Sequence, residues 1–274
     1  MRLLFCGDVV GRAGRDAVHR HLPALRRDLA LDMVVLNGEN AAHGFGITDR
    51  IAGEFYESGV DVVTTGNHAW DQRELLTTID QNPRLLRPEN FPPGTPGSGV
   101  FLHALPDGRS ALVVNLMARL FMDPLDCPFA AIDRVLAANA PLGRGIDAIV
   151  LDFHGEASSE KMAMGHYVDG RVSLCVGTHT HVPTADAQIL PGGTAYMTDA
   201  GMCGDYDSVI GMRKEPATQR FVRKIPGERL TPAEGEATLC GVYVEIDDGA
   251  GLARRVEPVR IGGRLAPAMP SRAG

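Results

Sequence analysis

One pattern occurs three times within about the first seventy residues, and it constrains the fold more than any other feature of the chain. A short apolar run ends in a polar turn that contains glycine, and a stretch with helical spacing follows. The runs cover residues 3–6, 33–36 and 60–65, and each is apolar on both faces, as in strands covered on both sides. Helices are predicted over 15–29 and 48–58. The chain therefore opens as β-α-β-α-β, which is typical of an α/β fold.

The same pattern returns later in the chain. Residues 106–109, Pro-Asp-Gly-Arg, predict the turn of a hairpin, and further apolar runs follow it. Little periodicity is visible over 201–236, a segment rich in glycine, proline and charge, and we expect it to run extended over the surface. The remaining predictions are a single domain over 1–274, hairpin strands at 100–105 and 111–116, a helix at 129–138, strands at 146–153 and 172–176, a helix at 158–165, and second-sheet strands at 238–246 and 253–261.

Side chains that can bind metals follow five of the predicted strands. They are Asp8, Glu39 with Asn40, Asn67 with His68, His154, and His179 with His181. If these strands are parallel neighbours, the side chains converge at one edge, where open α/β sheets bind ligands. The mixture of carboxylate, amide and imidazole suits Mn, Fe or Zn better than Ca or Mg. It exceeds what one four-coordinate zinc needs, so two ions are predicted. The alternative, that every histidine is structural, requires five coincidences.

These blocks resemble the five motifs of calcineurin-like metallophosphoesterases, in order, over about residues 1–185. A narrower resemblance is to the YmdB-like subfamily, through Gly38-Glu39-Asn40, DFHGEASSEK at 152–161, THTHVPTAD at 178–186 and TDAGM at 198–202. The resemblance implies a four-layer α/β/β/α sandwich with two mixed sheets. It also implies a ligand division, with one ion held by Asp8, Glu39, Asn40 and His181 and the other by Glu39, Asn67, His154 and His179.

Two departures from the general family pattern affect the site. The usual Asp-x-His of the first motif is missing, since Asp8 is followed by two valines, and Glu39 stands where a bridging aspartate is usual. Asn40 can supply the missing ligand. Ala69 replaces the carboxylate that normally follows the Gly-Asn-His block, so His68 must be oriented from elsewhere, and Asp71 is a candidate. Fe or Mn are the expected metals, with Zn as a further possibility.

The resemblance implies a dinuclear phosphodiesterase acting on 2′,3′- or 3′,5′-cyclic nucleotides. In two-metal chemistry a hydroxide that bridges the ions attacks phosphorus and the leaving oxygen needs a proton. We expect His68 to be the general acid; the alternative is that it is a third ligand of the second ion. Substrate contacts are predicted for His43, for Phe45 through base stacking, and for Arg119.

Two other functions fit the same residues. A phosphomonoesterase or nuclease would differ only in the shape of the pocket. A regulatory nucleotide- or RNA-binding protein would use the metals structurally, but the complete set of donors and an available His68 argue against it.

Charge and cysteine content limit the partners. The net charge of −7 argues against a broad nucleic-acid surface, and no apolar stretch is long enough for a signal peptide or a membrane span. The five cysteines are scattered and odd in number, which predicts reduced thiols in a cytoplasmic protein. The predicted partner is a small phosphoester, which we expect to be a nucleotide. The sequence leaves open a link to RNA and the formation of a homo-oligomer.

Overall fold

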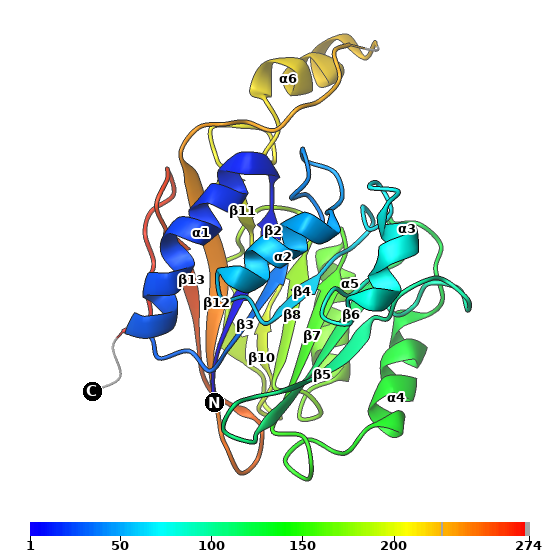
Figure 1. Ribbon diagram of the computed structural model, residues 1–274, viewed down its shortest axis with the longest axis vertical. Helices are drawn as coiled ribbons and strands as arrows, with labels where there is room; N and C mark the ends of the chain where they lie inside the picture. The colour runs from blue at the N-terminus through cyan, green and yellow to red at the C-terminus, as the bar shows by residue number, and fades with distance from the viewer. Residues whose placement is uncertain (226, 272–274) are drawn as a thin grey trace.

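Two mixed β-sheets lie face to face in the computed structural model, which describes residues 1–225 and 227–271 (Figure 1). Parallel pairing joins β1, β3 and β4, and β12 runs antiparallel to β1. In spatial order the first sheet contains β2 (Asp8–Val9), β11 (Met202–Asp205), β12 (Ala237–Ile246), β1 (Arg2–Cys6), β3 (Met33–Asn37) and β4 (Val62–Thr64), with β13 (Ala253–Ile261) paired to β12.

The second sheet is built around the parallel strands that follow the hairpin. The hairpin is confirmed: its strands pair antiparallel with Val100 opposite Val114. In spatial order this sheet contains β5 (Val100–Ala104), β6 (Ser110–Met117), β7 (Ala148–His154), β8 (Leu174–Thr178), β10 (Ala195–Met197) and β9 (Gln188–Ile189).

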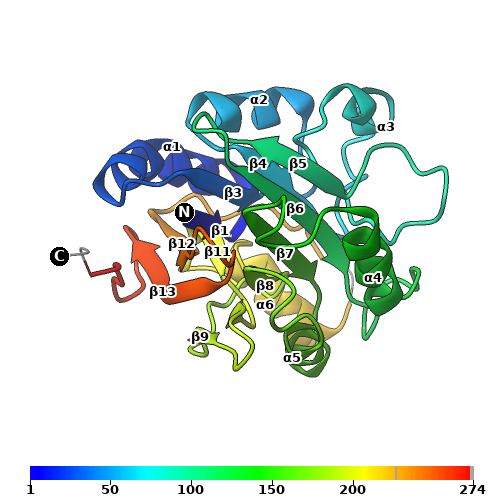
Figure 2. The same cartoon turned by 90° about the horizontal axis from the view of Figure 1, so that it is seen from below.

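Helices cover the outer face of each sheet (Figure 2). On the first sheet α1 (Gly11–Asp28) and α2 (Asp49–Glu57) pack through one buried apolar cluster. On the second, α4 (Pro128–Ala138) and α5 (Ser158–Tyr167) pack through another. A third cluster lies between the sheets, and it explains why the strands are apolar on both faces. The predicted four-layer sandwich with two mixed sheets is confirmed.

Residues of one strand divide between these clusters. In β1, Leu4 and Cys6 face the helices, whereas Leu3 and Phe5 face the second sheet. Thr48 caps α2, since its Oγ1 accepts a hydrogen bond from the amide of Ile51 at 3.2 Å. Several short elements were not predicted, namely the strands β2, β9 and β10, the helix α3 (Leu75–Thr78) and the 3₁₀ turn η1 (Ile79–Gln81). Every helix in the described part of the chain is too short or too polar to span a bilayer.

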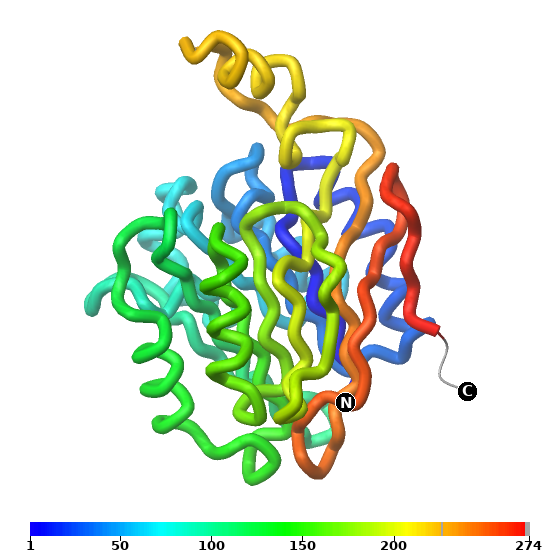
Figure 3. Tube along the Cα trace, turned by 180° about the vertical axis from the view of Figure 1, so that it is seen from behind, coloured from blue at the N-terminus to red at the C-terminus, as the bar shows by residue number. Residues whose placement is uncertain are grey.

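The expectation of an extended surface segment over 201–236 was wrong. The segment contains β11, which pairs with β2 and β12, and α6 (Lys214–Arg223). β11 has no local signal, since it is four residues long and its partners are distant in the chain, while α6 consists mostly of charged and polar residues and buries only Ala217. Figures 1 and 3 show α6 standing away from the two sheets.

Candidate metal centre

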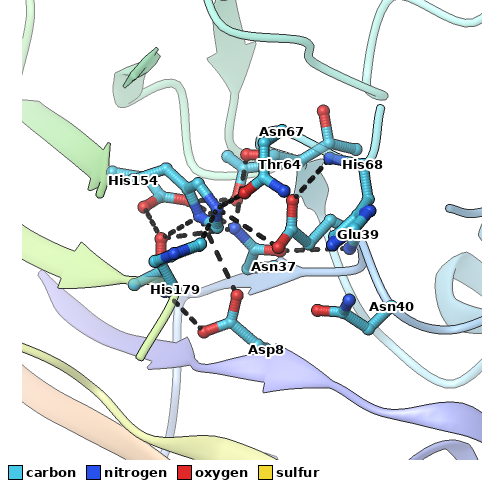
Figure 4. Close-up of polar contacts among 12 residues, drawn as sticks. Asp8, Asn37, Glu39, Asn40, Thr64, Asn67, His68, His154 and His179 are labelled. Atoms are coloured by element: carbon cyan, nitrogen blue, oxygen red, sulfur yellow. Dashed lines mark hydrogen bonds and ion pairs between the residues drawn. The ribbon is translucent and has the colours of Figure 1, made fainter. Parts of the chain in front are cut away.

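The predicted metal-binding side chains meet where the two sheets adjoin (Figure 4). Asp8 begins β2 directly after β1, His154 ends β7, and the others follow β3, β4 and β8. The expectation that all five strands are neighbours at one edge needs correction. β1, β3 and β4 belong to the first sheet and β7 and β8 to the second, because the hairpin at β5 and β6 starts a separate sheet. The centre is therefore assembled across the interface between the sheets.

Glu39 is shared by two groups of potential ligands. One group consists of Glu39, His154 and His179, and the other of Glu39, Asp8 and His181. In each group the potential ligand atoms lie within 4.8 Å of one another.

Each group gains one asparagine: Asn67 lies beside His154, and Asn40 lies beside His181. Asn67 Oδ1 lies 2.9 Å from Nε2 of His154, and Asn40 Oδ1 lies 3.2 Å from Nε2 of His181. The structure thus places together the same two sets of side chains that the resemblance implies.

A buried hydrogen-bond network fixes the ring of His154. Its Nδ1 lies 2.8 Å from Oγ1 of Thr178, whose own proton is donated to Asp152 at 2.7 Å. Asn37 Nδ2 donates to the other oxygen of Asp152 at 3.0 Å, as does the hydroxyl of Thr64 at 2.5 Å. Because the proton of Thr178 is engaged, the hydroxyl oxygen accepts from Nδ1 of His154. Nε2 is thereby left facing the other ligands.

The other two histidines are oriented in the same way. His181 Nδ1 donates to the carbonyl oxygen of Ile210 at 2.8 Å, which leaves Nε2 facing Asn40. His179 Nε2 lies 3.2 Å from a carboxylate oxygen of Glu156, and its Nδ1 lies 3.1 Å from Nε2 of His154. Each ring thus has one nitrogen fixed from outside and one directed into the centre, as metal-bound histidines have.

A strained turn carries His179 and His181. Both have left-handed backbone angles, with φ of 102° and 66°, which is uncommon for side chains other than glycine. Asp199 holds the residue between them, accepting from the amide of Thr180 at 3.0 Å and from its hydroxyl at 2.8 Å. The buried ammonium of Lys161 in turn donates to Asp199 at 2.8 Å.

Sequence reasoning assigned no role to these supporting residues. A signal was present, because Asp152 and Lys161 lie in DFHGEASSEK and Asp199 lies in TDAGM. Asp152 also interrupts an apolar strand, which marks a buried charge that needs partners.

Buried carboxyl groups are concentrated at the centre. Oδ1 of Asp8 is buried and has no hydrogen-bond partner among the described residues, while Oδ2 accepts from the amide of His179 at 3.1 Å. Burial raises the pKa of Asp8 well above its ordinary value, against the charge of His154. Burial also raises the pKa of Asp152, although His154 and three hydrogen-bond donors oppose it.

Glu39 and His154 form an ion pair among the protein groups. Burial opposes ionisation of Glu39, but the charge and hydrogen bond of His154 outweigh it and lower the pKa to about 2. Burial likewise lowers the pKa of His154, but Glu39, Asp8 and Asp152 outweigh it and raise that pKa to about 9. Burial and the charge of His154 lower the pKa of His179 to about 3, so this ring is neutral and able to bind a metal.

These features fit a divalent cation. A cation would give the unpartnered oxygen of Asp8 a partner and would favour the ionised form of this buried carboxyl group, whose pKa is raised without it. Imidazole with carboxylate and amide oxygen is a donor set for divalent transition metals.

His68 lies beside the centre and outside both ligand groups. Its amide donates to Glu39 Oε2 at 3.1 Å, and its Nδ1 lies 2.7 Å from Oδ2 of Asp71, the partner suggested by the missing carboxylate at Ala69. Phe45 packs edge-on against the His68 ring with 5.3 Å between centroids.

The remaining predicted substrate contacts are less closely placed. His43 is exposed on the loop of Phe45 at a left-handed φ of 54° and lines a cavity with it. Arg119 is exposed, and its amide is held by the carboxylate of Glu160 at 3.0 Å. In the described part of the chain no hydrogen bond joins the Arg119 side chain to the centre.

Comparisons with known proteins agree with this geometry. A family model described as "YmdB-like protein" matches residues 4–259. A Bacillus subtilis protein named 2′,3′-cyclic-nucleotide 2′-phosphodiesterase is 48% identical over 261 residues, which cover 95% of this chain and 97% of that protein.

Two solved structures have the same fold over most of the chain. A Thermus thermophilus protein described as hypothetical is 43% identical with a TM-score of 0.89, and the match covers 96% of this chain and 100% of that one. A Mycoplasma pneumoniae protein described as a novel phosphatase is 32% identical with a TM-score of 0.88, covering 96% and 93%.

Proposed function

The chain belongs to the YmdB-like family and is a phosphoric ester hydrolase, and on this premise we propose that it is a phosphodiesterase that opens the ring of a cyclic nucleotide with two metal ions. The observation that carries the proposal is the position of Glu39, which is shared by both groups of potential ligands. A shared carboxylate lets two ions lie close enough to act on one phosphoryl group.

Each ion is assigned a complete set of donors. One set is Asp8, Glu39, Asn40 and His181; the other is Glu39, Asn67, His154 and His179. Fe or Mn, with Zn as a further candidate, match imidazole mixed with oxygen donors. When bound, the ions would supply Lewis acidity, which polarises the phosphoryl oxygens and makes water a stronger nucleophile at neutral pH.

His68 is proposed as the general acid. Its Nδ1 is engaged by Asp71 at 2.7 Å, so Nε2 is the nitrogen available to the substrate. Water bonds to phosphorus and loses a proton to solvent, the bond from phosphorus to the leaving oxygen breaks, and that oxygen takes a proton from His68, which solvent then reprotonates. The alternative role as a ligand is disfavoured because His68 lies in neither ligand group.

The name of the Bacillus subtilis relative supports a 2′,3′-cyclic nucleotide as the substrate, in which the 2′-oxygen leaves. A purine or pyrimidine could stack on the ring of Phe45, which contacts His68. His43 and Arg119 remain weaker proposals for substrate contact. We also propose a cytoplasmic location, because all five cysteines are free thiols.

Parallel assays separate this function from its alternatives. The Mn-supplemented protein is offered 2′,3′-cyclic AMP, p-nitrophenyl phosphate and a single-stranded RNA. Hydrolysis of the cyclic nucleotide at least tenfold faster than of the other two supports the proposal. Preference for the monoester or for RNA would favour a phosphatase or a nuclease, and tight binding without turnover would favour a regulatory protein.

A further inference from the structure

Two adjoining cavities lie beside Phe45, under the arm, by which we mean residues 206–225 and 227–235 with α6. Their volumes are about 1010 Å³ and 390 Å³, and both are lined by Phe45, Gln72, Arg229 and Leu230. Figures 1 and 3 show α6 standing above the end of the molecule at which the parallel strands finish. The cavities thus separate the arm from the loops that carry Phe45 and His68.

The smaller cavity adjoins the residues that surround the ring of His68. Asp71, one of its lining residues, contacts Nδ1 of His68, and Phe45 contacts the same ring. A general acid must reach the 2′-oxygen, so the ribose of a cyclic nucleotide would lie within reach of His68, and its base would stack on Phe45. Because Phe45 also lines the smaller cavity, a group on the 5′-oxygen of this nucleoside would extend toward that cavity.

The smaller cavity has a surplus of positive charge. Its charged lining residues are Asp71, Arg220 and Arg229, and Asp71 is engaged with His68. Arg220 and Arg229 are exposed, and within 1–225 and 227–271 neither has a carboxylate in ion-pair range, whereas Lys214 of the same arm pairs with Asp207 at 2.8 Å.

The larger cavity has charges of both signs along its lining. Arg12, Arg213, Lys214 and Arg229 line it, and so do Asp207, Glu215 and Glu234. In the smaller cavity the one carboxylate among the described lining residues, Asp71, contacts His68, which leaves Arg220 and Arg229 together without an acidic neighbour of their own. Two unpaired guanidinium groups are suited to a phosphate, which they can bind through paired hydrogen bonds.

We propose that Arg220 and Arg229 bind a second phosphate of the substrate, carried on the 5′-oxygen of the nucleoside that bears the cyclic phosphate. The substrate class is then a nucleotide with a 2′,3′-cyclic phosphate at one end and a phosphate, or a further nucleotide, on its 5′-oxygen. This inference rests on the proposed function. A cyclic mononucleotide would leave both arginines unused, whereas the end of an oligonucleotide would occupy the cavity, whose volume lies in the range of ligand sites.

Kinetics with two substrates test the inference. Adenosine 2′,3′-cyclic phosphate is compared with the same compound carrying a 5′-phosphate. We expect the 5′-phosphate to raise kcat/KM at least tenfold, mainly by lowering KM, and the ratio to fall to about one in the Arg220→Ala/Arg229→Ala variant. The matched control is Arg223→Ala, from the same helix but lining neither cavity, and it should keep the preference.

A binding measurement separates failure of this inference from failure of the proposed function. Calorimetry compares adenosine 3′,5′-bisphosphate with adenosine 3′-phosphate, and neither needs to be hydrolysed. Binding of the bisphosphate at least tenfold more tightly, with loss of the difference in the double variant, supports the site even if turnover is absent. Equal binding of the two, or a preference that survives the double substitution, would overturn it.

Discussion

Nε2 of His154 lies 3.2 Å from Oε1 of Glu39, although the two residues follow strands of different sheets. Glu39 follows β3, and His154 ends β7. Their approach depends on how the two sheets pack, and the apolar cluster between the sheets sets that distance. The centre is therefore a product of the whole sandwich, and its supporting residues can be tested separately from its ligands.

Replacement of His68 should separate chemistry from metal binding. His68→Ala is expected to lower kcat on a cyclic nucleotide by about 10²–10⁴-fold, the range for loss of a general acid, because His68 lies outside both ligand groups. Steady-state kinetics and elemental analysis of the same preparation check this. A parallel loss of bound metal would show that His68 is a ligand.

Asp71 is expected to act by positioning His68. Asp71→Asn weakens the contact at Nδ1 and should lower kcat on the order of tenfold, with KM and metal content close to wild type. Asp71→Glu, which restores the carboxylate, should recover part of kcat. If KM changes and kcat does not, Asp71 serves substrate binding instead.

Thr178 is expected to raise metal affinity, because its hydroxyl oxygen contacts Nδ1 of His154 and so orients the ring. Thr178→Val removes the acceptor of Nδ1 and one donor to Asp152 while nearly preserving volume. Loss of such a partner typically costs about 10–100-fold in metal affinity or activity. Titration of the metal-depleted protein with Mn²⁺ measures the effect, and an unchanged affinity would contradict the assigned role.

Two lysines in ion pairs of equal length give a stability comparison. Lys161 is 1% exposed and donates to Asp199 at 2.8 Å, whereas Lys214 pairs with Asp207 at 2.8 Å on the surface. Lys161→Met leaves a buried carboxylate unpaired and should reduce the free energy of unfolding by about 3–5 kcal/mol. Lys214→Met should leave the urea midpoint near wild type. Equal midpoints for the two variants would contradict this account.

The sequence was sufficient for the parts of the fold that local pattern controls. Apolar runs covered on both faces and the polar residues after them predicted the strands and the ligand candidates. β2 could not be predicted in this way, because two residues become a strand only through pairing with β11, far along the chain. α6 was missed for a different reason, because most of its residues are charged or polar and only Ala217 is buried.

The residues of the candidate site likewise fall into those that local sequence predicts and those that it does not. Side chains directly after strands are visible in the sequence, whereas their partners are chosen by tertiary packing. Glu156, Asp199 and the carbonyl of Ile210 reach the histidines from separate segments, and only the three-dimensional structure brings them together. The strands that precede the ligand candidates belong to two sheets. The packing of the sandwich determines this division, and no local motif marks it.

Metal stoichiometry tests the central claim most directly. The protein is loaded with Mn²⁺, freed of excess metal and analysed for metal per chain and for hydrolysis of 2′,3′-cyclic AMP, beside Glu39→Gln and the exposed control Glu57→Gln. We predict about two ions per chain and diester hydrolysis in the wild type and the control. Both should be lost together in Glu39→Gln, because both groups of ligands share Glu39. Full metal content and full activity in Glu39→Gln would contradict the account.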